Sequence, residues 1–217
     1  QPSSLLSKSS LMRLINQFVF EDIDLLIIDY NLSPVQQRNL ENYFKCKVID
    51  RSQLIIEIFG IRAKSKEGKL QVELASLSFQ KTRLVRSWTH LERQRGGGGF
   101  IGGPGESQIE LDRRMINQKI KFIKRDLKKI ISTRNLQRLN RNRKKHAVVS
   151  FVGYTNTGKS SIFNSLTKSN VFVKNMPFST LDPTIRTFKY DHEHFNKIML
   201  SDTVGFISAL PVELINS

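Results

Sequence analysis

The sequence has few of the residues that build disulfide or metal scaffolds. Its 217 residues contain one cysteine, Cys46, and four histidines that are scattered along the chain. A single cysteine forms no internal disulfide, and these histidines form no cluster at zinc-ligand spacing. The sequence also lacks a run of about 18 apolar residues and an apolar signal-peptide core. We therefore expect a globular, cytoplasmic protein with no integral membrane association.

Acidic residues are scarce as well. The chain has 35 Lys and Arg against 19 Asp and Glu, and residues 113–145 alone hold fourteen basic residues and one acid, Asp126. Such a surface attracts a phosphate backbone, and no row of aromatic residues indicates stacking of single-stranded bases. The segment therefore favours structured RNA or DNA as a partner. A solvated helix face and an anionic membrane surface are the weaker alternatives.

Residues 1–67 show the alternation of a small α/β domain. Apolar positions at helical spacing predict a helix over residues 10–20, and short apolar runs predict buried strands over 24–30 and 46–49. Between the strands, Ser33 and Pro34 suit an N-cap and a first helical position, and Gln36 stands in the capping-box place. Helix, strand, helix, strand in this order predicts parallel strands.

Residues 68–145 show two apolar series with the spacing of a coiled-coil seam. The first is Leu70, Leu74, Leu77, Leu84, Trp88 and Leu91, and the second is Ile109, Ile116, Ile120, Ile123, Leu127 and Ile130. Two such helices joined by a short loop predict an antiparallel hairpin. The joining loop, residues 96–105, holds seven of the twelve glycines together with Phe100, Ile101 and Pro104. A flexible linker would be rich in Gly and Ser and would lack residues such as Phe100, Ile101 and Pro104. We therefore favour a functional tip over a simple turn.

A new domain is predicted over residues 146–217, because the composition changes at His146 to a buried-strand run that ends at Gly153. Gly-x4-Gly-Lys-Ser follows that strand and precedes an amphipathic run, which is the context of a P-loop. Backbone amides from Asn156 to Ser161 would surround a β-phosphate, Lys159 would neutralise the β and γ oxygens, and Ser160 would bind magnesium. The candidate nucleotide-binding residues are Gly153, Tyr154, Thr155, Asn156, Thr157, Gly158, Lys159, Ser160 and Ser161.

A second phosphate-side element follows downstream of the P-loop. An apolar run leads into Asp202, Thr203, Val204 and Gly205. In nucleotide switches, an Asp at the end of a strand holds Mg²⁺ and a Gly offers its N–H to the γ-phosphate. The loop between the two elements, residues 177–184, carries two candidate switch threonines, Thr180 and Thr184.

Together these residues resemble the HflX family of ribosome-associated GTPases. The resemblance rests on residues 91–114 with their glycine-rich loop, on 153–160, on Phe178-Ser-Thr-Leu-Asp182 and on Asp202-Thr-Val-Gly205. It implies an α/β fold with three parts: an N-terminal α/β domain with parallel strands, an antiparallel long-helix hairpin and a P-loop GTPase domain. It also implies a monomer that binds GTP and the large ribosomal subunit with its rRNA, not DNA, and that splits or rescues stalled ribosomes under stress.

Several site residues follow from the resemblance alone. It adds Phe178, Ser179, Thr180, Leu181 and Asp182 to the nucleotide site, and it favours Thr180 over Thr184 as a ligand of Mg²⁺ beside Ser160 and Asp202. Phe206 stands where many small GTPases place the glutamine that orients water. No catalytic residue is therefore predicted. A ribosomal group or a potassium ion near Asn156 would have to take that part.

The family reads guanine with an Asn-Lys-x-Asp motif well downstream of Asp202, and this chain ends fifteen residues after that aspartate. We therefore expect a fragment that lacks the second half of the GTPase domain and the start of the first domain. Two alternatives remain open. The chain is an RNA- or ribosome-binding module or decayed fragment without GTPase activity, or it comes from an ATP-driven P-loop enzyme that acts on nucleic acid.

Overall fold

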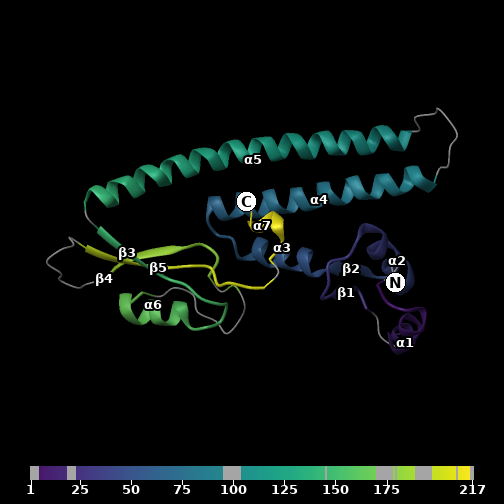
Figure 1. The fold of residues 1–217 in the computed structure, drawn as a ribbon, viewed down its shortest axis with the longest axis horizontal. Helices are drawn as coiled ribbons and strands as arrows, with labels where there is room; N and C mark the ends of the chain where they lie inside the picture. Colours follow the sequence, from purple (N-terminus) through teal and green to yellow (C-terminus); the bar gives the residue numbers. More distant parts are fainter. Residues whose placement is uncertain are drawn as a thin grey trace. The chain divides into compact units, whose positions relative to one another are not determined.

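The computed structural model describes residues 5–18, 23–94, 104–144, 146–169, 178, 180–188, 197–208 and 210–215. Most of the predicted glycine-rich tip (residues 96–103) and the candidate Ser179 lie outside the described residues. The chain divides into two compact units: the first comprises Gln1–Glu57 and Ala75–Ile120, and the second comprises Ile58–Leu74 and Lys121–Ser217. Figure 1 labels the elements of both units.

The first unit begins with the predicted helix, strand, helix and strand. They are α1 (Lys8–Phe18), β1 (Leu25–Ile28), α2 (Pro34–Phe44) and β2 (Lys47–Asp50), and the two strands pair in parallel as predicted. The prediction that the first strand is buried is wrong, because Leu25 and Ile27 of β1 are 43% and 49% exposed. The capping box at α2 is confirmed, because the Gln36 amide donates to Ser33 Oγ at 3.2 Å and the Ser33 amide donates to Gln36 Oε1 at 2.9 Å. Buried side chains of α1, α2, β2 and the loop before α2 form the core of this unit: Leu11, Leu32, Leu40 and Val48.

Helix α3 (Arg51–Arg62) follows β2 without a loop and was not predicted from the sequence. Asp50, the last residue of β2, accepts a hydrogen bond on Oδ1 from the Gln53 amide at 2.8 Å. This contact caps the first turn of the helix. The helix was missed because the apolar residues among 51–62 are not gathered on one face, so the sequence shows no clear helical periodicity there.

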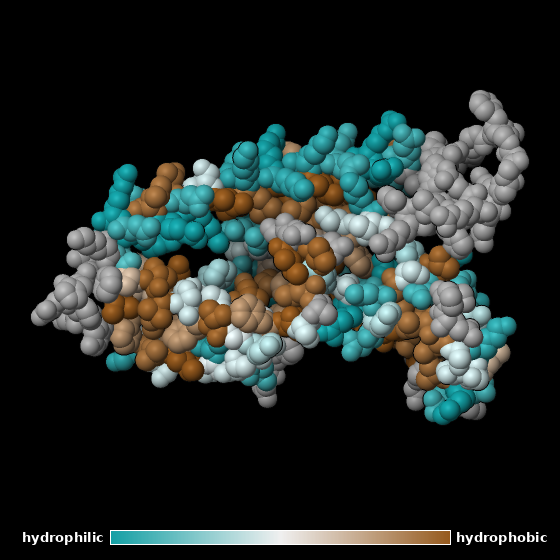
Figure 2. Space-filling model, in the orientation of Figure 1, coloured by the Kyte–Doolittle hydropathy of each residue, from teal (hydrophilic) through white to brown (hydrophobic). Residues whose placement is uncertain are grey.

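The two predicted long helices are α4 (Lys66–Gln94) and α5 (Pro104–Arg143). Within the second unit, Arg134 near the end of α5 pairs with Glu67 in the first turn of α4 at 2.7 Å, so the two helices are antiparallel there. Seam positions Leu74, Leu77, Ile123 and Leu127 are buried, as the heptad spacing predicts. Five others are half-buried: Leu70, Leu84, Ile116, Ile120 and Ile130. The side chains of Trp88, Leu91 and Ile109 lie outside the described part. Figure 2 shows hydrophilic residues along α5.

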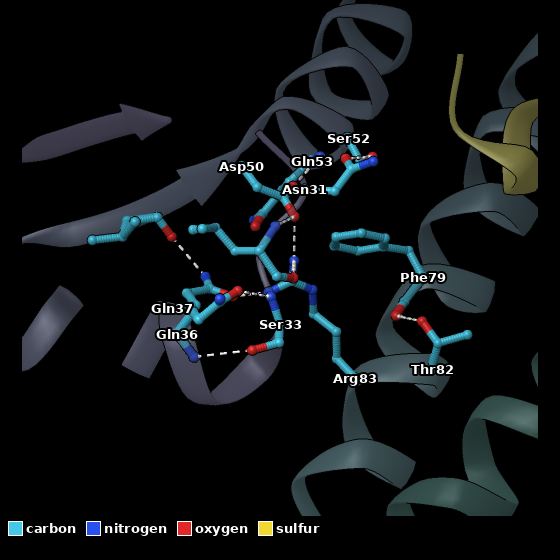
Figure 3. Close-up of polar contacts among 12 residues, drawn as sticks. Asn31, Ser33, Gln36, Gln37, Asp50, Ser52, Gln53, Phe79, Thr82 and Arg83 are labelled. Atoms are coloured by element: carbon cyan, nitrogen blue, oxygen red, sulfur yellow. Dashed lines mark hydrogen bonds and ion pairs between the residues drawn. The ribbon is translucent and has the colours of Figure 1, made fainter. Parts of the chain in front are cut away.

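One arginine of α4 joins that helix to the α/β part of the first unit. Arg83 donates to Asp50 Oδ2, to Gln37 Oε1 and, at 3.3 Å, to the carbonyl oxygen of Leu32, and its guanidinium lies 4.4 Å from the centre of the Phe79 ring (Figure 3). Asp50 is 1% exposed. A buried carboxylate needs such partners, because an unpaired charge in the interior is costly.

The second unit is built on a three-stranded sheet of order β3-β5-β4, formed by β3 (His146–Phe151), β5 (Lys197–Asp202) and β4 (Thr184–Phe188). β3 and β5 are parallel, with Phe151 opposite Asp202, and β4 is antiparallel to β5. Helix α6 (Lys159–Thr167) follows β3, and α7 (Val212–Ile215) lies near the end of the chain. Phe163 of α6 is fully buried, with its ring centre 6.3 Å from that of Phe151. Because β3 and β5 end together, the loops that follow them meet.

Among the described helices, none combines the length and the apolarity needed to cross a membrane.

Candidate functional site

The loop between β3 and α6 has the backbone of a phosphate-binding turn. Asn156 and Gly158 both have positive φ, at 61° and 84°, and Gly158 is the N-cap of α6. Positive φ is strained for most residues but open to glycine and tolerated by asparagine, so these two residue types suit the turn. The result is a tight loop that ends at a helix N-terminus, where backbone N–H groups attract anions.

The loop after β5 is bonded directly to this turn. The Thr155 amide donates to the Phe206 carbonyl at 3.1 Å, and the Phe206 amide donates to the Gly153 carbonyl at 2.9 Å. Gly205 lies at the closest point, because a Cβ on this residue would come within 2.6 Å of Thr155 Cα. A glycine is therefore required where the two phosphate-side loops touch.

The turn surrounds a small cavity of about 50 Å³, the size of a phosphate group's site rather than of a whole ligand pocket. Lys159 Nζ donates to the Tyr154 carbonyl, which also accepts from Thr157 Oγ1 at 2.8 Å. Many of the predicted residues line the cavity: Thr155, Asn156, Thr157, Gly158, Lys159, Ser160, Ser161, Phe178, Thr180, Thr203 and Gly205.

Three oxygen-bearing side chains converge beside this cavity. Ser160 Oγ donates to Asp202 Oδ2 at 2.6 Å, Thr180 Oγ1 donates to the same oxygen at 3.0 Å, and the two hydroxyl oxygens are 2.7 Å apart. They come from the first turn of α6, the loop before β4 and the end of β5, and all are buried, with exposed fractions of 8%, 8% and 0% for Ser160, Thr180 and Asp202. The predicted metal ligands are thus brought together.

The chemistry of this cluster fits a small divalent cation. Asp202 Oδ1 is buried and has no hydrogen-bond partner among the described residues, so one carboxylate oxygen is left for a positive ligand. Mg²⁺ prefers oxygen ligands and is held in proteins by one or two carboxylates together with substrate phosphates. Two hydroxyls and one carboxylate next to a phosphate-sized cavity match that preference.

Most of the other predicted residues lie around the cavity rather than in it. Thr184 begins β4 and stands opposite Asp202 in the sheet, so it does not line the phosphate cavity. Thr203 does line the cavity, and its Oγ1 donates to the Phe151 carbonyl at 2.6 Å. Leu181, Asp182 and Val204 line a second cavity of about 330 Å³ in the same unit.

Asp182 faces the start of α4 instead of the phosphate cavity. Its Oδ2 accepts from the Lys64 amide at 2.9 Å and from the Ser65 amide at 2.8 Å, and its Oδ1 accepts from Ser65 Oγ. Burial acts to raise the pKa of Asp182, but the hydrogen bonds from Ser65 and Lys64, with the charge of Arg134, outweigh it and hold the pKa below its ordinary value. Lys64 and Ser65 were not predicted as partners of Asp182, because no local pattern indicates a contact across more than a hundred residues.

The second unit has a P-loop between a parallel strand and a helix, and the end of a neighbouring strand brings an aspartate next to that P-loop. This arrangement defines a P-loop nucleotide-binding protein. Three family models match consecutive parts of the chain: "GTP-binding GTPase N-terminal" at residues 1–60, "GTP-binding GTPase Middle Region" at 62–141 and "50S ribosome-binding GTPase" at 148–216. The chain belongs to the HflX family of GTPases.

Its relatives include proteins named GTPase HflX. That of Magnetococcus marinus is 49% identical over 214 residues, which are 99% of this chain and 49% of the relative. That of Escherichia coli is 48% identical over 190 residues, 88% of this chain and 44% of the relative. The chain therefore spans about half the length of these relatives.

A solved structure described as the complex of SsGBP and GDP is similar as well. It is 27% identical, with a TM-score of 0.51 over 97% of this chain and 53% of that one.

Proposed function

We propose that this chain is the part of a GTPase that carries the P-loop and the long helices α4 and α5, and that this GTPase binds GTP with Mg²⁺. The observation that carries this proposal is the buried cluster of Ser160, Thr180 and Asp202, with one carboxylate oxygen unpaired, beside a phosphate-sized cavity. Guanine as the base is supported by the GDP complex of SsGBP and by the names of the relatives. We divide the chain into parts at 1–67, 68–145 and 146–217, and the three consecutive family-model matches support that division.

The residues of the cavity have separate tasks in this proposal. The amides of residues 156–161 bind the β-phosphate at the N-terminus of α6, and the Lys159 ammonium leaves the Tyr154 carbonyl to pair with the β and γ oxygens. Ser160 and Thr180 would hold Mg²⁺ through their hydroxyls, and Asp202, which accepts hydrogen bonds from both, would supply the carboxylate of the site. When bound, the ion neutralises charge that develops on the transferred phosphoryl group.

We assign no described residue to the task of positioning the attacking water. Phe206 follows Gly205 and its side chain is exposed, and an aromatic ring offers neither donor nor acceptor to an attacking water. We therefore assign that task to a group from outside the described residues, either a potassium ion near Asn156 or a group of the bound partner.

The partner we propose is the large ribosomal subunit, through its rRNA backbone. The residues of α5 from 131 to 140 are all exposed, and α5 carries twelve of the fourteen basic residues of the segment 113–145. Figure 2 shows hydrophilic residues along this helix. A phosphate backbone is the complement of such a surface. The description "50S ribosome-binding GTPase" of the model that matches residues 148–216 supports this partner. Action as a monomer in splitting or rescuing ribosomes under stress, in the cytoplasm, stays a prediction from the family resemblance.

Nucleotide binding is tested in the full-length protein with Lys159→Ala. Loss of a charge-assisted contact to the phosphates should weaken binding of a fluorescent GTP analogue at least tenfold. Lys197→Ala is the matched control, because Lys197 is an exposed lysine of the same unit that begins β5 and does not line the cavity. Equal affinity in Lys159→Ala and the control would disprove the assignment of the phosphate site.

Ribosome binding is tested by reversing Arg138, Arg141, Arg143 and Lys144 to Glu. Co-sedimentation with large subunits should fall, and its dependence on salt concentration should flatten. The control reverses four basic residues of the first unit: Lys8, Arg13, Arg38 and Lys45. If both variants co-sediment like the wild type across a salt series, the basic stretch of α5 is a solvated face.

A further inference from the structure

The loop that carries Thr180 is attached at both of its ends to residues 59–68 of the same unit. At one end Phe178 is buried against Phe59 of α3, with ring centres 4.6 Å apart and planes at 66°. At the other end Asp182 accepts hydrogen bonds from the α3–α4 junction. Thr180 lies midway between these two contacts, so its position depends on both.

The contact at Asp182 is a complete carboxylate site within the chain. Both of its oxygens are used: Lys64 and Ser65 donate through their amides at 2.9 Å and 2.8 Å, and Ser65 also donates through its hydroxyl. The same hydroxyl accepts from the Gly68 amide at 2.9 Å, as the N-cap of α4. A carboxylate at a helix N-terminus is further stabilised by the helix dipole. These three bonds are charge-assisted and therefore stronger than bonds between neutral groups.

Gly68 is the residue that leaves room for this contact. A Cβ on Gly68 would lie 2.6 Å from Asp182 Oδ1, closer than real Cβ atoms approach, and 3.1 Å from Ser65 Oγ, which is a tight contact. Glycine inside a helix costs about 1 kcal/mol relative to alanine. The first turn of α4 thus carries an unfavourable residue at a place where a methyl group would displace the carboxylate.

We infer that Asp182 is a positioning residue, which fastens the Thr180 loop to the first turn of α4 and so holds the Thr180 hydroxyl where Mg²⁺ is bound. The inference rests on the proposed function. Thr180 Oγ1 lies 3.0 Å from Asp202 Oδ2 only while its loop keeps this course, and a ligand held in place beforehand binds its ion without the entropic cost of ordering the loop. The affinity for Mg²⁺ and GTP is thereby linked to the junction at which α4 begins.

The test uses the full-length protein with Gly68→Ala. The added methyl displaces the Asp182 carboxylate while it favours the helix, so an unfolded variant is not expected. The Mg²⁺ concentration needed for half of the fluorescence change of a GTP analogue should rise about tenfold, the effect of losing one charge-assisted hydrogen bond. Gly60→Ala is the matched control, because Gly60 is also helical and its Cβ would meet only Val72 Cγ1 at 3.8 Å.

Ser65 gives a second pair of variants. Ser65→Ala removes the hydroxyl and should raise the Mg²⁺ requirement like Gly68→Ala, whereas Ser65→Thr keeps the hydroxyl and should restore it. Hydrogen exchange of the Lys64 and Ser65 amides in the nucleotide-free protein should be faster in Gly68→Ala, because these amides lose their acceptor.

The outcomes separate the inference from the proposed function. If the wild type needs Mg²⁺ for GTP and Gly68→Ala needs no more of it, the positioning role is wrong and the function stands. If the requirement rises while exchange at residues 64 and 65 is unchanged, the effect does not pass through Asp182 and the inference is also wrong. If the wild type binds no GTP at any Mg²⁺ concentration, the proposed function fails.

Discussion

Two aspartates, one in each unit, occupy the same place in the fold and have opposite surroundings. Asp50 ends β2 and Asp202 ends β5, each strand is paired in parallel, and the two side chains are 1% and 0% exposed. Asp50 has the Arg83 guanidinium and the amides of Leu32 and Gln53 as donors. Asp202 accepts hydrogen bonds from two hydroxyls on one oxygen, and its other oxygen has no partner in the part of the chain that the structure describes.

This difference shows how a structural carboxylate can be told from a binding one. Residue type, strand position and burial are the same for both, so none of them decides the role. The charge of Asp50 is balanced by Arg83 of α4, so Asp50 has a structural role within the first unit. The charge of Asp202 is not balanced by a cation among the described residues, which is the condition for holding one from solution.

The largest effect is expected at Asp50. Asp50→Ala leaves the Arg83 guanidinium without its carboxylate, and breaking a buried pair in this way costs about 3–5 kcal/mol of unfolding free energy. Urea denaturation should show this loss, while GTP affinity of the folded protein stays unchanged. Asp29→Ala is the control, because the Asp29 side chain is 81% exposed in its pair with Arg51, and it should change stability little. A small effect at Asp50 would remove the basis of the comparison.

Asp202 should give the reverse result. Asp202→Ala should raise the Mg²⁺ requirement for GTP binding about a hundredfold, equal to about 2.8 kcal/mol. Unfolding free energy should change by less than about 1 kcal/mol, since Ser160 and Thr180 can still bond to each other. Titration of a fluorescent GTP analogue against Mg²⁺, with urea denaturation of the same variant, measures both quantities. A purely structural Asp202 would show the opposite pattern.

Gly205 tests how closely the two phosphate-side loops must fit around Asp202. Gly205→Ala places a methyl group within 2.8 Å of three Thr155 atoms, two of which belong to the backbone. Overpacking of this kind costs about 1–3 kcal/mol, and displacement of the P-loop should weaken GTP binding about tenfold. Isothermal titration with GTP checks the prediction. If Gly205→Ala binds GTP as tightly as the wild type, the loops after β3 and β5 do not need to touch for GTP to bind, and the prediction is wrong.

The smallest effect is expected at Arg134, which sharpens the contrast with Arg83. Both arginines belong to long helices and pair with a carboxylate, but the side chains of Arg134 and Glu67 are 49% and 11% exposed, against 19% and 2% for Arg83 and Asp50. Solvent screens such a pair, so Arg134→Ala should lower the unfolding free energy by about 1 kcal/mol or less. A double-mutant cycle with Glu67→Ala would measure the coupling energy. A coupling as large as that expected between Asp50 and Arg83 would show that exposure does not separate the two.

Local patterns explain which predictions were confirmed. The capping box at Ser33, the strand before the P-loop and the buried seam positions of the long helices depend on residues a few positions apart, so the sequence shows them directly. The burial predicted for that strand is wrong, because Val148 and Val149 of β3 are 45% and 50% exposed, and burial depends on neighbours in space. The bounds of the first helix differ by two residues from the prediction, a shift within the fraying of helix ends. Helix α3 was missed, since its first turn depends on the Asp50 cap more than on a visible apolar stripe.

The sequence by itself determined that a P-loop follows a strand and that Asp202 stands at the end of another, because motif and periodicity are local properties of the chain. It also identified Asp182 through the family motif, without saying what that carboxylate would face. Only the tertiary structure decided that Asp50 is neutralised by Arg83, that Asp202 keeps an unpaired oxygen and that Asp182 binds the start of α4. The physical reason is that a buried charge is defined by its neighbours in space: Arg83 lies 33 residues from Asp50 along the chain, Ser160 lies 42 from Asp202 and Ser65 lies 117 from Asp182.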